Sequence, residues 1–371
     1  MPLSVLIAGG GTGGHLYPGI AVARELIARV PLAEVTFVGT AAGIETRVIP
    51  HEGFALDVIR SAGVKGKSIQ LAARGIALLP LSAADAWSVI TRRKPSVVIG
   101  VGGYSSGPIV LLAALRGVPT LLMEQNAMPG LTNRILATVV DAAAVTFGES
   151  AAFFGGKAVV SGNPVRQEFF RNEEAHGHDL PPPGAARVLV FGGSQGAHAI
   201  NMAMVEAAPR LAAASPRVAI THQTGERDLE MVRDSYRRAG LEARVEPFLF
   251  AMSREMNAAD LVVCRAGATT VAELTASGKP SLLVPLPTAT DDHQRKNAQA
   301  LVNDGAAVMI EQRELSGDRL AAEVLSLAGD RERRQRMGEA ARRLARPDAA
   351  SVIVDRVLEL VKDKEPVRIA R

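Results

Sequence analysis

The chain has 371 residues, of which 47% are hydrophobic, 22% charged and 4% aromatic, and its formal net charge is +4. This composition fits a soluble globular protein. No uninterrupted apolar run reaches about 18 residues, so the sequence predicts no membrane-spanning helix. The one cysteine, Cys264, excludes a disulfide within the chain and suits a reducing cytosol. The length predicts about two domains.

In the first half, apolar runs typical of buried strands alternate with helical patterns. Residues 18–30 have the apolar stripe of a helix, and Pro18 suits the first turn of that helix. The apolar runs predict strands over residues 4–8, 34–39, 96–101 and 119–124. Continuous apolar strands separated by helices indicate a parallel sheet covered on both faces.

The second half repeats this plan, with strands predicted over residues 187–192, 217–223, 259–265 and 280–285. "VLIAGGGTGGH" (5–15) matches "VLVFGGSQGAH" (188–198), and "VVIGVGGYSS" (97–106) matches "LVVCRAGATT" (261–270). Each of these stretches is a strand, a glycine loop and the start of a helix. The repeat therefore predicts two Rossmann-like domains in series, facing across a ligand cleft at the carboxyl ends of their strands.

The domain boundaries follow from a polar stretch with three consecutive prolines, "NEEAHGHDLPPPGAA" (172–186). We predict an N-terminal domain over residues 1–165, a linker over 166–186, and a C-terminal domain over 187–345. Residues 346–371 contain an amphipathic pattern, which we expect to form a helix that packs back towards the N-terminal domain.

Positive charge is concentrated in the first half, where residues 1–160 carry 13 Lys/Arg and 9 Asp/Glu. Most of the excess lies in residues 60–94, beside leucines and the only tryptophan, Trp87. An apolar patch rimmed by basic residues favours peripheral binding to anionic lipid, so residues 65–94 are predicted to bind an anionic membrane surface. The alternative is a core helix with a solvated basic face.

Glycine loops that lead into helices let backbone N–H groups approach an anion, and the helix dipole adds positive potential. Four such loops suit a ligand with several phosphates. Gly9, Gly11 and Gly14 also fit the G-x-G-x-x-G pattern of dinucleotide enzymes, but no acidic residue ends the second strand to hold a ribose. A nicotinamide or flavin enzyme is therefore disfavoured.

Eight motifs between residues 9 and 298 resemble, in their order, those of the MurG family of bacterial peptidoglycan glycosyltransferases. They are "GGGTGGHLYPGIAVA", "GVGGYSSGP", "EQNAMPGLTNR", "GNPVR", "VFGGSQGA", "HQTG", "VCRAGATTVAEL" and "DDHQRKNA". The resemblance implies a GT-B fold at the cytoplasmic face of the inner membrane. It implies an inverting, UDP-N-acetylglucosamine-dependent hexosyltransferase, which transfers the sugar to the 4-hydroxyl of undecaprenyl-diphospho-muramyl-pentapeptide in peptidoglycan synthesis.

For the donor, the resemblance implies that Glu273 accepts the ribose hydroxyls and that the backbone of Leu249 reads the uracil edge. The other residues implied to bind substrate on this side are Asn126, Arg166, Ser194, Ala268, Thr269, Thr270, Val271, Ala272, His293 and Gln294. No D-x-D motif is present, and "TDDH" (290–293) is the nearest candidate metal site. We expect no metal and no cofactor, because the glycine loop at Ser194 and the helix start at Ala268 can take the phosphate charge.

Asn133 is expected to bind substrate. Tyr104 is expected beside the acceptor, whereas Thr12, Gly13 and Gly14 can hold either donor or acceptor diphosphate. Two residues compete for the role of base. His15 lies at a helix start, where the dipole favours a neutral imidazole that can take a proton. Glu124 ends a strand, but Met123 stands where the family usually has a histidine partner. His198 is interpreted as structural.

Three alternatives stay open. A non-hydrolysing UDP-N-acetylglucosamine epimerase shares the domain plan and the donor, and a transferase to another lipid acceptor shares the donor loops. A nucleic-acid binder fits the basic sequence but not the scarcity of aromatic residues, and no nucleic-acid partner is expected.

Overall fold

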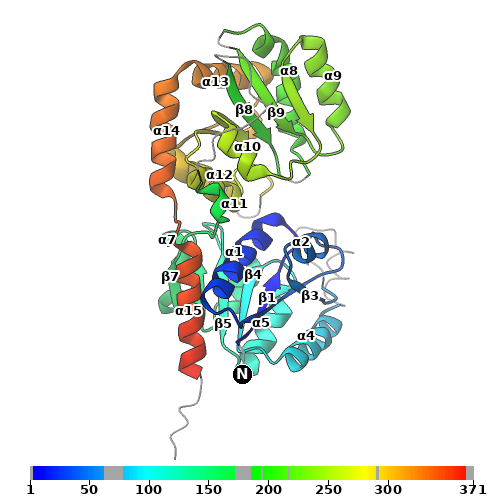
Figure 1. Cartoon of the computed structure of the whole chain (residues 1–371), viewed down its shortest axis with the longest axis vertical. Coiled ribbons are helices and arrows are strands. Elements are labelled where there is room, and N and C mark those ends of the chain that lie inside the picture. Colours follow the sequence, from blue (N-terminus) through cyan, green and yellow to red (C-terminus); the bar gives the residue numbers. More distant parts are fainter. Residues whose placement is uncertain are drawn as a thin grey trace, which may run out of the picture. The chain divides into compact units, whose positions relative to one another are not determined.

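The computed structural model describes residues 3–61, 78–171, 185–193, 195–215, 217–289 and 292–364. The chain divides into two compact units: unit 1 comprises Met1–Val165 and Asp348–Arg371, and unit 2 comprises Arg166–Pro347. Figure 1 shows that each unit is a sheet flanked by helices. The C-terminal helix belongs to unit 1, although 182 residues of unit 2 separate it in sequence from the rest of that unit.

The described part of unit 1 holds a seven-stranded sheet in the order β3-β2-β1-β4-β5-β6-β7, with every neighbouring pair parallel. Its strands are β1 (Ser4–Gly9), β2 (Glu34–Gly39), β3 (Ala55–Val58), β4 (Val97–Gly102), β5 (Thr120–Glu124), β6 (Ala142–Val145) and β7 (Ala158–Val160). The strand order reverses between β1 and β4. Their carboxyl ends therefore form a topological switch point, where such sheets bind ligands.

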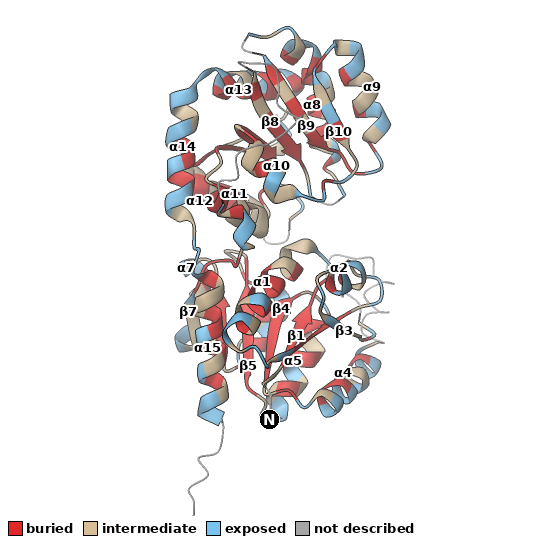
Figure 2. Cartoon of the chain, viewed as in Figure 1, coloured by how far each residue is buried: buried red, intermediate tan, exposed pale blue. Residues whose placement is uncertain are grey.

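Two hydrophobic layers cover this sheet. The helices of unit 1 in its described residues are α1 (Gly13–Arg29), α2 (Glu45–His51), α4 (Leu79–Arg93), α5 (Ser106–Leu115), α6 (Leu131–Leu136), α7 (Gly148–Ala151) and α15 (Ala349–Lys364). One layer joins α1 and α15 to the sheet through residues such as Leu16, Ile20 and Val357, and the other contains residues of α4, α5 and α6. The central strands are buried, whereas the edge strands β3 and β7 are partly exposed, as are the outer faces of the helices (Figure 2).

In its described residues, unit 2 has a six-stranded parallel sheet in the order β10-β9-β8-β11-β12-β13, with the switch point between β8 and β11. Its strands are β8 (Ala186–Phe191), β9 (Val218–Gln223), β10 (Ala243–Glu246), β11 (Leu261–Cys264), β12 (Ser281–Leu283) and β13 (Ala307–Met309). Its helices are α8 (His198–Ala212), α9 (Leu229–Ala239), α10 (Met252–Ala258), α11 (Ala268–Ser277), α12 (His293–Asn303), α13 (Gly317–Gly329) and α14 (Arg331–Leu344). Both units are thus Rossmann-like, as predicted.

The predicted position of Pro18 is wrong. Helix α1 begins at Gly13, so Pro18 lies inside the helix and not in its first turn. Glycines are poor helix formers, and the sequence pattern therefore starts the helix too late. Packing overrides that preference, because Leu16 and Ile20 are fully buried against the sheet.

The predicted linker is described only in part. Residues 166–171 pack on unit 2, where Phe169 is 1% exposed and the amide of Asn257 donates to the carbonyl oxygen of Arg171 at 2.8 Å. This part of the predicted linker is therefore anchored to unit 2 by its buried aromatic ring. Residues 172–184, which include the three prolines, lie outside the described residues.

Candidate functional site

Two glycine loops meet at the switch point of unit 1. After β1, Gly9, Gly10 and Gly11 have φ angles of 144°, 147° and 82°, a region that favours glycine. A Cβ on Gly9 would lie 2.2 Å from the carbonyl oxygen of Gly102 at the end of β4, and the Gly10 N–H donates to that oxygen at 3.2 Å. Glycine is therefore needed for the two loops to touch, and the contact sets the start of α1 beside the end of β4.

A buried carboxylate supports the first of these loops. Glu45, in the first turn of α2, is 1% exposed and accepts hydrogen bonds from the Gly11 N–H at 2.8 Å and from the N–H and hydroxyl of Thr40 at 2.8 and 3.1 Å. A Cβ on Gly43 would lie 2.0 Å from this carboxylate. Sequence reasoning missed Glu45, because a glutamate that opens a short polar helix is usually solvated.

The His15 side chain lies over the second glycine loop. A Cβ on Gly102 would lie 2.7 Å from His15 Nδ1, so only a glycine leaves room for the ring. His15 Nδ1 is 3.1 Å from Oε1 of Gln125, and Gln125 Nε2 donates to the carbonyl oxygen of Val101 at 3.1 Å. Gln125 is 2% exposed and was also missed, although it stands between two predicted site residues.

Glu124 is buried at the end of β5, and its carboxylate is fully engaged. One oxygen accepts from the backbone and side-chain amides of Asn126 at 2.9 and 3.2 Å, and the other accepts from Gly130 N–H at 3.0 Å and Asn133 Nδ2 at 2.9 Å. The structure therefore brings three predicted site residues, Glu124, Asn126 and Asn133, into one hydrogen-bonded cluster. This arrangement orients the two amides and leaves the carboxylate little capacity to accept a proton from a substrate.

The other predicted residues of unit 1 lie near these loops. Thr12 is exposed and immediately precedes α1, and Gly13 and Gly14 form the first turn of that helix. Tyr104 follows the second glycine loop and is 49% exposed, and its carbonyl oxygen accepts from the Ser61 hydroxyl at 2.9 Å.

In unit 2, a buried glutamine ties two loops together. Gln223, at the end of β9, donates from Nε2 to the carbonyl oxygen of Gly193 at 2.8 Å and accepts at Oε1 from the Leu249 N–H at 2.8 Å. The N–H of Leu249 is therefore occupied, and a uracil edge would have to meet its carbonyl group instead. The predicted residue Ser194 lies outside the described residues. Gln223 belongs to the motif "HQTG" (222–225), which by itself predicts no role for this side chain.

Glu273 lies on α11 directly after the predicted residues that form the start of that helix, which are Ala268, Thr269, Thr270, Val271 and Ala272. Desolvation raises the pKa of Glu273 to about 7, whereas the guanidinium of Arg166 opposes this rise. Arg166 itself pairs with Glu168 at 2.9 Å and lies over the Phe169 ring. A carboxylate of this kind can accept two hydroxyl groups when it is ionised.

The loop before α11 is held by an asparagine that sequence reasoning also missed. Asn297 on α12 is fully buried, and its Nδ2 donates to the carbonyl oxygen of Ala266 at 3.1 Å. The predicted sugar-binding residues His293 and Gln294 lie in the first turn of the same helix, where Gln294 Oε1 accepts from the Leu286 N–H at 3.0 Å. Helix α12 therefore supports two loops at the carboxyl end of the sheet.

The candidate metal site "TDDH" is described only at Asp292 and His293. Asp292 has a left-handed backbone with φ of 56°, and its carboxylate pairs with Arg295 at 2.5 Å. Within the described ranges, no three His, Cys, Asp or Glu side chains are grouped so that they could hold a metal ion.

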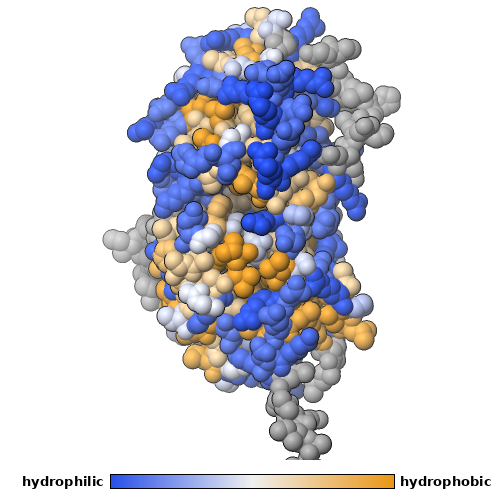
Figure 3. Space-filling model, turned by 90° about the vertical axis from the view of Figure 1, so that its left-hand side faces the viewer, coloured by the Kyte–Doolittle hydropathy of each residue, from blue (hydrophilic) through white to orange (hydrophobic). Residues whose placement is uncertain are grey.

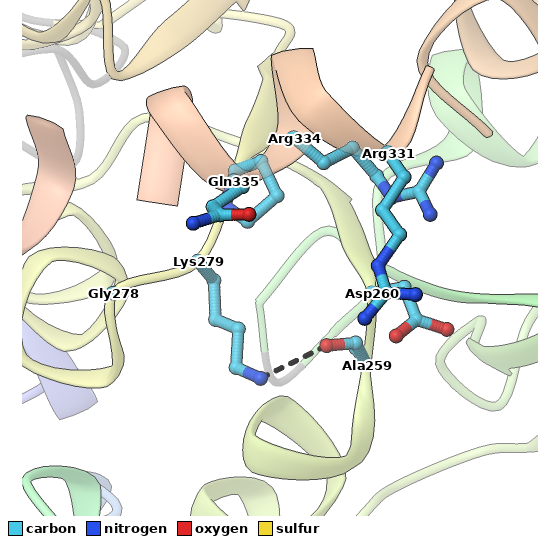
Figure 4. Close-up of a pocket in the computed structure, with 8 residues that line it drawn as sticks. Ala259, Asp260, Gly278, Lys279, Arg331, Arg334 and Gln335 are labelled. Atoms are coloured by element: carbon cyan, nitrogen blue, oxygen red, sulfur yellow. Dashed lines mark hydrogen bonds between the residues drawn. The ribbon is translucent and has the colours of Figure 1, made fainter. Parts of the chain in front are cut away.

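A separate pocket of about 280 Å³ lies at the amino ends of the unit 2 strands, opposite the end that carries the glycine loops (Figure 4). Lys279 reaches into it from the turn before β12 and donates to the carbonyl oxygens of Asn257 and Ala259 at 2.7 and 2.9 Å. Burial lowers the pKa of Lys279 to about 8. Since the glycine loops lie at the other end of the strands, this pocket is distinct from the predicted donor site.

The predicted membrane-binding segment is described from residue 78 onward, and residues 65–77 lie outside the described residues. On α4, Leu79, Leu81 and Trp87 expose 51%, 42% and 53% of their surfaces, and Leu115 at the end of α5 exposes 70%. The guanidinium of Arg116 lies 4.6 Å from the centre of a Trp87 ring. Figure 3 shows a different side of the molecule, the one that carries α14 and α15 in Figure 1, where hydrophobic and hydrophilic residues are interspersed.

The basic residues of this segment are paired more than their count suggests. Asp57, just outside the counted residues, accepts from Arg93 at 2.8 Å and pairs with Arg92 at 3.1 Å, and these guanidinium groups lower the pKa of Asp57. Arg60 forms a bidentate pair with Asp85 at 2.6 and 2.8 Å. The three described arginines of residues 60–94 thus face two aspartates, and one of these, Asp57, lies outside that range.

Two family descriptions match the chain in the same order as its two sheets. The Glycosyltransferase family 28 N-terminal domain matches residues 5–145, and the Glycosyltransferase family 28 C-terminal domain matches residues 187–353.

The chain belongs to glycosyltransferase family 28.

A curated relative from Anaeromyxobacter sp. (strain K) is 50% identical over 365 residues, which cover 97% of this chain and 94% of the relative. It is named UDP-N-acetylglucosamine–N-acetylmuramyl-(pentapeptide) pyrophosphoryl-undecaprenol N-acetylglucosamine transferase. Membership in family 28 and this identity over nearly the whole chain both agree with the family resemblance that the eight motifs show.

Among solved structures, Acinetobacter baumannii MurG matches with a TM-score of 0.76 and 30% identity, over 96% of this chain and all of that one. This family 28 chain therefore has the α/β, GT-B fold class. A UDP-GlcNAc 2-epimerase from Neisseria meningitidis, solved with UDP-GlcNAc bound, matches with a TM-score of 0.66 at 12% identity, over 97% of this chain and 100% of that one. At that identity the likeness shows the fold alone.

Proposed function

We propose that this chain is an inverting hexosyltransferase. It transfers N-acetylglucosamine from UDP-N-acetylglucosamine to the 4-hydroxyl of undecaprenyl-diphospho-muramyl-pentapeptide, which converts lipid I to lipid II in peptidoglycan synthesis. The observation that carries the proposal is the 50% identity, over 97% of the chain, to a relative named for this transfer. The name of that relative agrees with the resemblance that the ordered motifs of the sequence show.

In this proposal unit 2 binds the donor. The ionised Glu273 accepts both ribose hydroxyls, and the Leu249 carbonyl, held by Gln223, meets the uracil edge. His293 and Gln294 contact the sugar hydroxyls from α12, and Asn126 is a further proposed contact of the sugar. These contacts leave the departing diphosphate near the start of α11.

The departing diphosphate needs positive potential, because negative charge grows on it in the transition state. The first turn of α11 (Ala268–Ser277) lies at the positive end of the helix dipole, so it supplies such potential without an ion. Arg166 adds a guanidinium if the diphosphate competes for it with Glu168. In this mechanism the reaction needs no metal, and activity is expected to persist in excess chelator. Loss of activity on chelation and its return with magnesium or manganese would contradict this part of the proposal.

His15 is the proposed base. Its ring is fixed by Gln125 and the glycine backbone, whereas Glu124 is engaged in four hydrogen bonds and positions Asn126 and Asn133. A neutral imidazole near the acceptor hydroxyl can remove its proton as the sugar is transferred. Thr12 to Gly14 hold the acceptor diphosphate in this arrangement, and Tyr104 lies at its edge.

The acceptor is lipid-linked, so we propose that the enzyme works at the cytoplasmic face of the plasma membrane. The exposed apolar side chains of α4 and α5, here called the α4–α5 patch (Leu79, Leu81, Trp87 and Leu115), are its membrane contact. No described helix is long and apolar enough to cross a bilayer. Sedimentation with anionic vesicles checks the contact. Leu81→Ser should weaken binding, whereas Leu32→Ser, at a leucine that is 80% exposed elsewhere on unit 1, should not.

The function is tested by incubating the enzyme with UDP-N-acetylglucosamine and the lipid-linked muramyl acceptor. Release of UDP together with a disaccharide lipid supports the proposal. Epimerised UDP-sugar without an acceptor would support the epimerase alternative, and UDP release only with a different lipid would support transfer to another acceptor. Either of these outcomes would overturn the proposal.

A further inference from the structure

Gln125 joins the candidate base to the sheet, and nothing in the family resemblance assigns it a role. It is 2% exposed, and its side-chain amide has one partner on each side: the carbonyl oxygen of Val101 and the Nδ1 atom of His15. The inference below rests on the proposed function, because it concerns the proton that His15 accepts.

The orientation of this amide follows from its partners. A backbone carbonyl can only accept a hydrogen bond, so the NH₂ group of Gln125 must face Val101. If the amide were flipped, two oxygen atoms would face each other at about 3.1 Å. The amide oxygen of Gln125 therefore faces His15 Nδ1, at 3.1 Å.

The orientation of the amide in turn decides the proton position on the imidazole. An amide oxygen can only accept, so the nitrogen that faces it must carry hydrogen. In a neutral imidazole only one nitrogen carries hydrogen, and the other then has a free lone pair. The contact between Gln125 and His15 thus favours the tautomer with Nδ1 protonated and Nε2 able to accept a proton.

We propose that Gln125 is a positioning residue that holds His15 in the Nδ1–H tautomer, so that Nε2 is the atom that takes the proton of the acceptor hydroxyl. Gln125 touches no substrate in this role. It acts through His15, and the β4 carbonyl of Val101 acts through Gln125. Two hydrogen bonds thus connect the sheet to the imidazole: one joins Val101 to Gln125, and the other joins Gln125 to His15.

A neutral amide has a different effect from a carboxylate at this position. A carboxylate beside an imidazole stabilises the charged imidazolium, whereas an amide selects the tautomer without adding charge. The two buried carboxylates on neighbouring elements, Glu45 and Glu124, bond to amide groups and to Thr40, and neither bonds to His15. Gln125 is thus the side chain that sets the hydrogen-bonding state of His15 Nδ1.

Two substitutions separate tautomer selection from a merely structural role. Gln125→Leu keeps the volume but offers no acceptor, so we expect kcat to fall about tenfold to a hundredfold, since the wrong tautomer cannot act as base. The KM for UDP-N-acetylglucosamine should change less than twofold. Gln125→Glu should move the acidic limb of the pH profile of kcat/KM to higher pH by about one unit, because the new carboxylate favours imidazolium. Gln335→Glu, at an exposed glutamine of α14, is the matched control and should leave the profile in place.

A second measurement does not depend on turnover. Nitrogen-15 spectra of the imidazole groups distinguish the two neutral tautomers, and the His15 signal is identified by its loss in His15→Gln. We expect the Nδ1–H form in the unaltered protein and a shift towards the Nε2–H form in Gln125→Leu. An Nε2–H form in the unaltered protein, or an acidic limb that Gln125→Glu does not move, would overturn the inference while leaving the transfer intact. Absence of UDP release with the lipid acceptor would instead overturn the proposed function.

Discussion

The two units begin with the same strand, glycine loop and helix, but a buried glutamine serves each loop differently. In unit 1, Gln125 links the sheet to the imidazole of His15, and in unit 2, Gln223 links the glycine loop to the backbone of Leu249. The first glutamine prepares a side chain that can take a proton. The second glutamine fixes the backbone of Leu249, which can recognise a nucleobase. In the proposed function, the same fold thus positions the catalytic side chain in unit 1 and the nucleotide-binding backbone in unit 2.

The comparison predicts that substitutions in unit 1 mainly change kcat and those in unit 2 mainly change KM. The largest expected effect is for His15→Ala, which removes the proposed base and should lower kcat about 10²-fold to 10⁴-fold with little change in KM for the donor. Steady-state kinetics at saturating acceptor measure this. His51→Ala, at an exposed histidine of unit 1, is the control and should have no effect.

Glu124→Gln sharpens the same test. If Glu124 only positions Asn126 and Asn133, its loss should cost less turnover than the loss of His15, and the pH profile should keep its acidic limb. Glu149→Gln, at an exposed glutamate of the same unit, serves as the control. A loss of kcat larger than that of His15→Ala would show that Glu124 is the base and that the division of roles within unit 1 is wrong.

The strands around these residues could be predicted from the sequence, whereas the hydrogen bonds could not. Long apolar runs such as residues 34–39 predict strands well, and β2 occupies that range. Short strands such as β7 and β13 have three residues each, and too few positions show a pattern. Sequence reasoning also missed Gln125, since its partner His15 lies 110 positions away in the chain and only the fold brings them together.

Buried carboxylates were interpreted least well, because burial is a property of the fold. Glu45 lies in a polar stretch, and its carboxylate has space only because the nearby residues are glycines, which have no Cβ atom. Glu124 was identified as a site residue, but its role depends on four donors that the strand pattern does not show. The strand pattern thus predicts where the Glu124 backbone lies but not the partners of its carboxylate.

In unit 2 the next largest effect is expected at Glu273. Glu273→Gln should raise the KM for UDP-N-acetylglucosamine about tenfold to a hundredfold with kcat little changed, since hydrogen bonds to a charged group contribute about 1.5–3 kcal/mol. The unaltered enzyme should show a related pH effect. Because the pKa of Glu273 is about 7, the carboxyl is protonated at lower pH and accepts hydroxyls less well. KM should therefore rise as the pH falls below about 7, and this rise should be absent in Glu273→Gln. A KM independent of pH between 6 and 8 would contradict this role.

A smaller effect concerns the stability of unit 2. His222 is fully buried between Tyr236 and Asn201, and burial lowers its pKa from 6.5 to about 3. The unfolded chain therefore binds a proton below pH 6.5 that the folded unit does not. The contribution of His222 to stability is complete above pH 6.5 and is lost as the pH falls towards 3, by up to about 1.4 kcal/mol per pH unit.

Hydrogen exchange of the β9 amides, corrected for its intrinsic pH dependence, measures this loss in unit 2. In His222→Gln the decline between pH 6.5 and 5 should be shallower than in the unaltered protein. His51→Gln in unit 1 should leave the decline in β9 unchanged. Equal slopes in the unaltered protein and in His222→Gln would mean that His222 is not the group that titrates.

The smallest predicted effect concerns the α4–α5 patch. This patch is a second proposed difference between the units, because it gives unit 1 the contact with the membrane. Arg116 lies over Trp87 and donates to the Thr91 hydroxyl at 2.9 Å, so it covers part of the indole while it carries a positive charge. Arg116→Ala removes an attraction to anionic lipid of about 1 kcal/mol, a factor of about five, but exposes more aromatic surface. Binding to anionic vesicles should therefore weaken by about fivefold or less, whereas binding to neutral vesicles should strengthen. Arg210→Ala on unit 2, at a guanidinium that is 52% exposed, should change neither. Because the two lipid types should respond in opposite directions, an equal loss with both would mean that Arg116 holds the patch in shape and does not contact lipid.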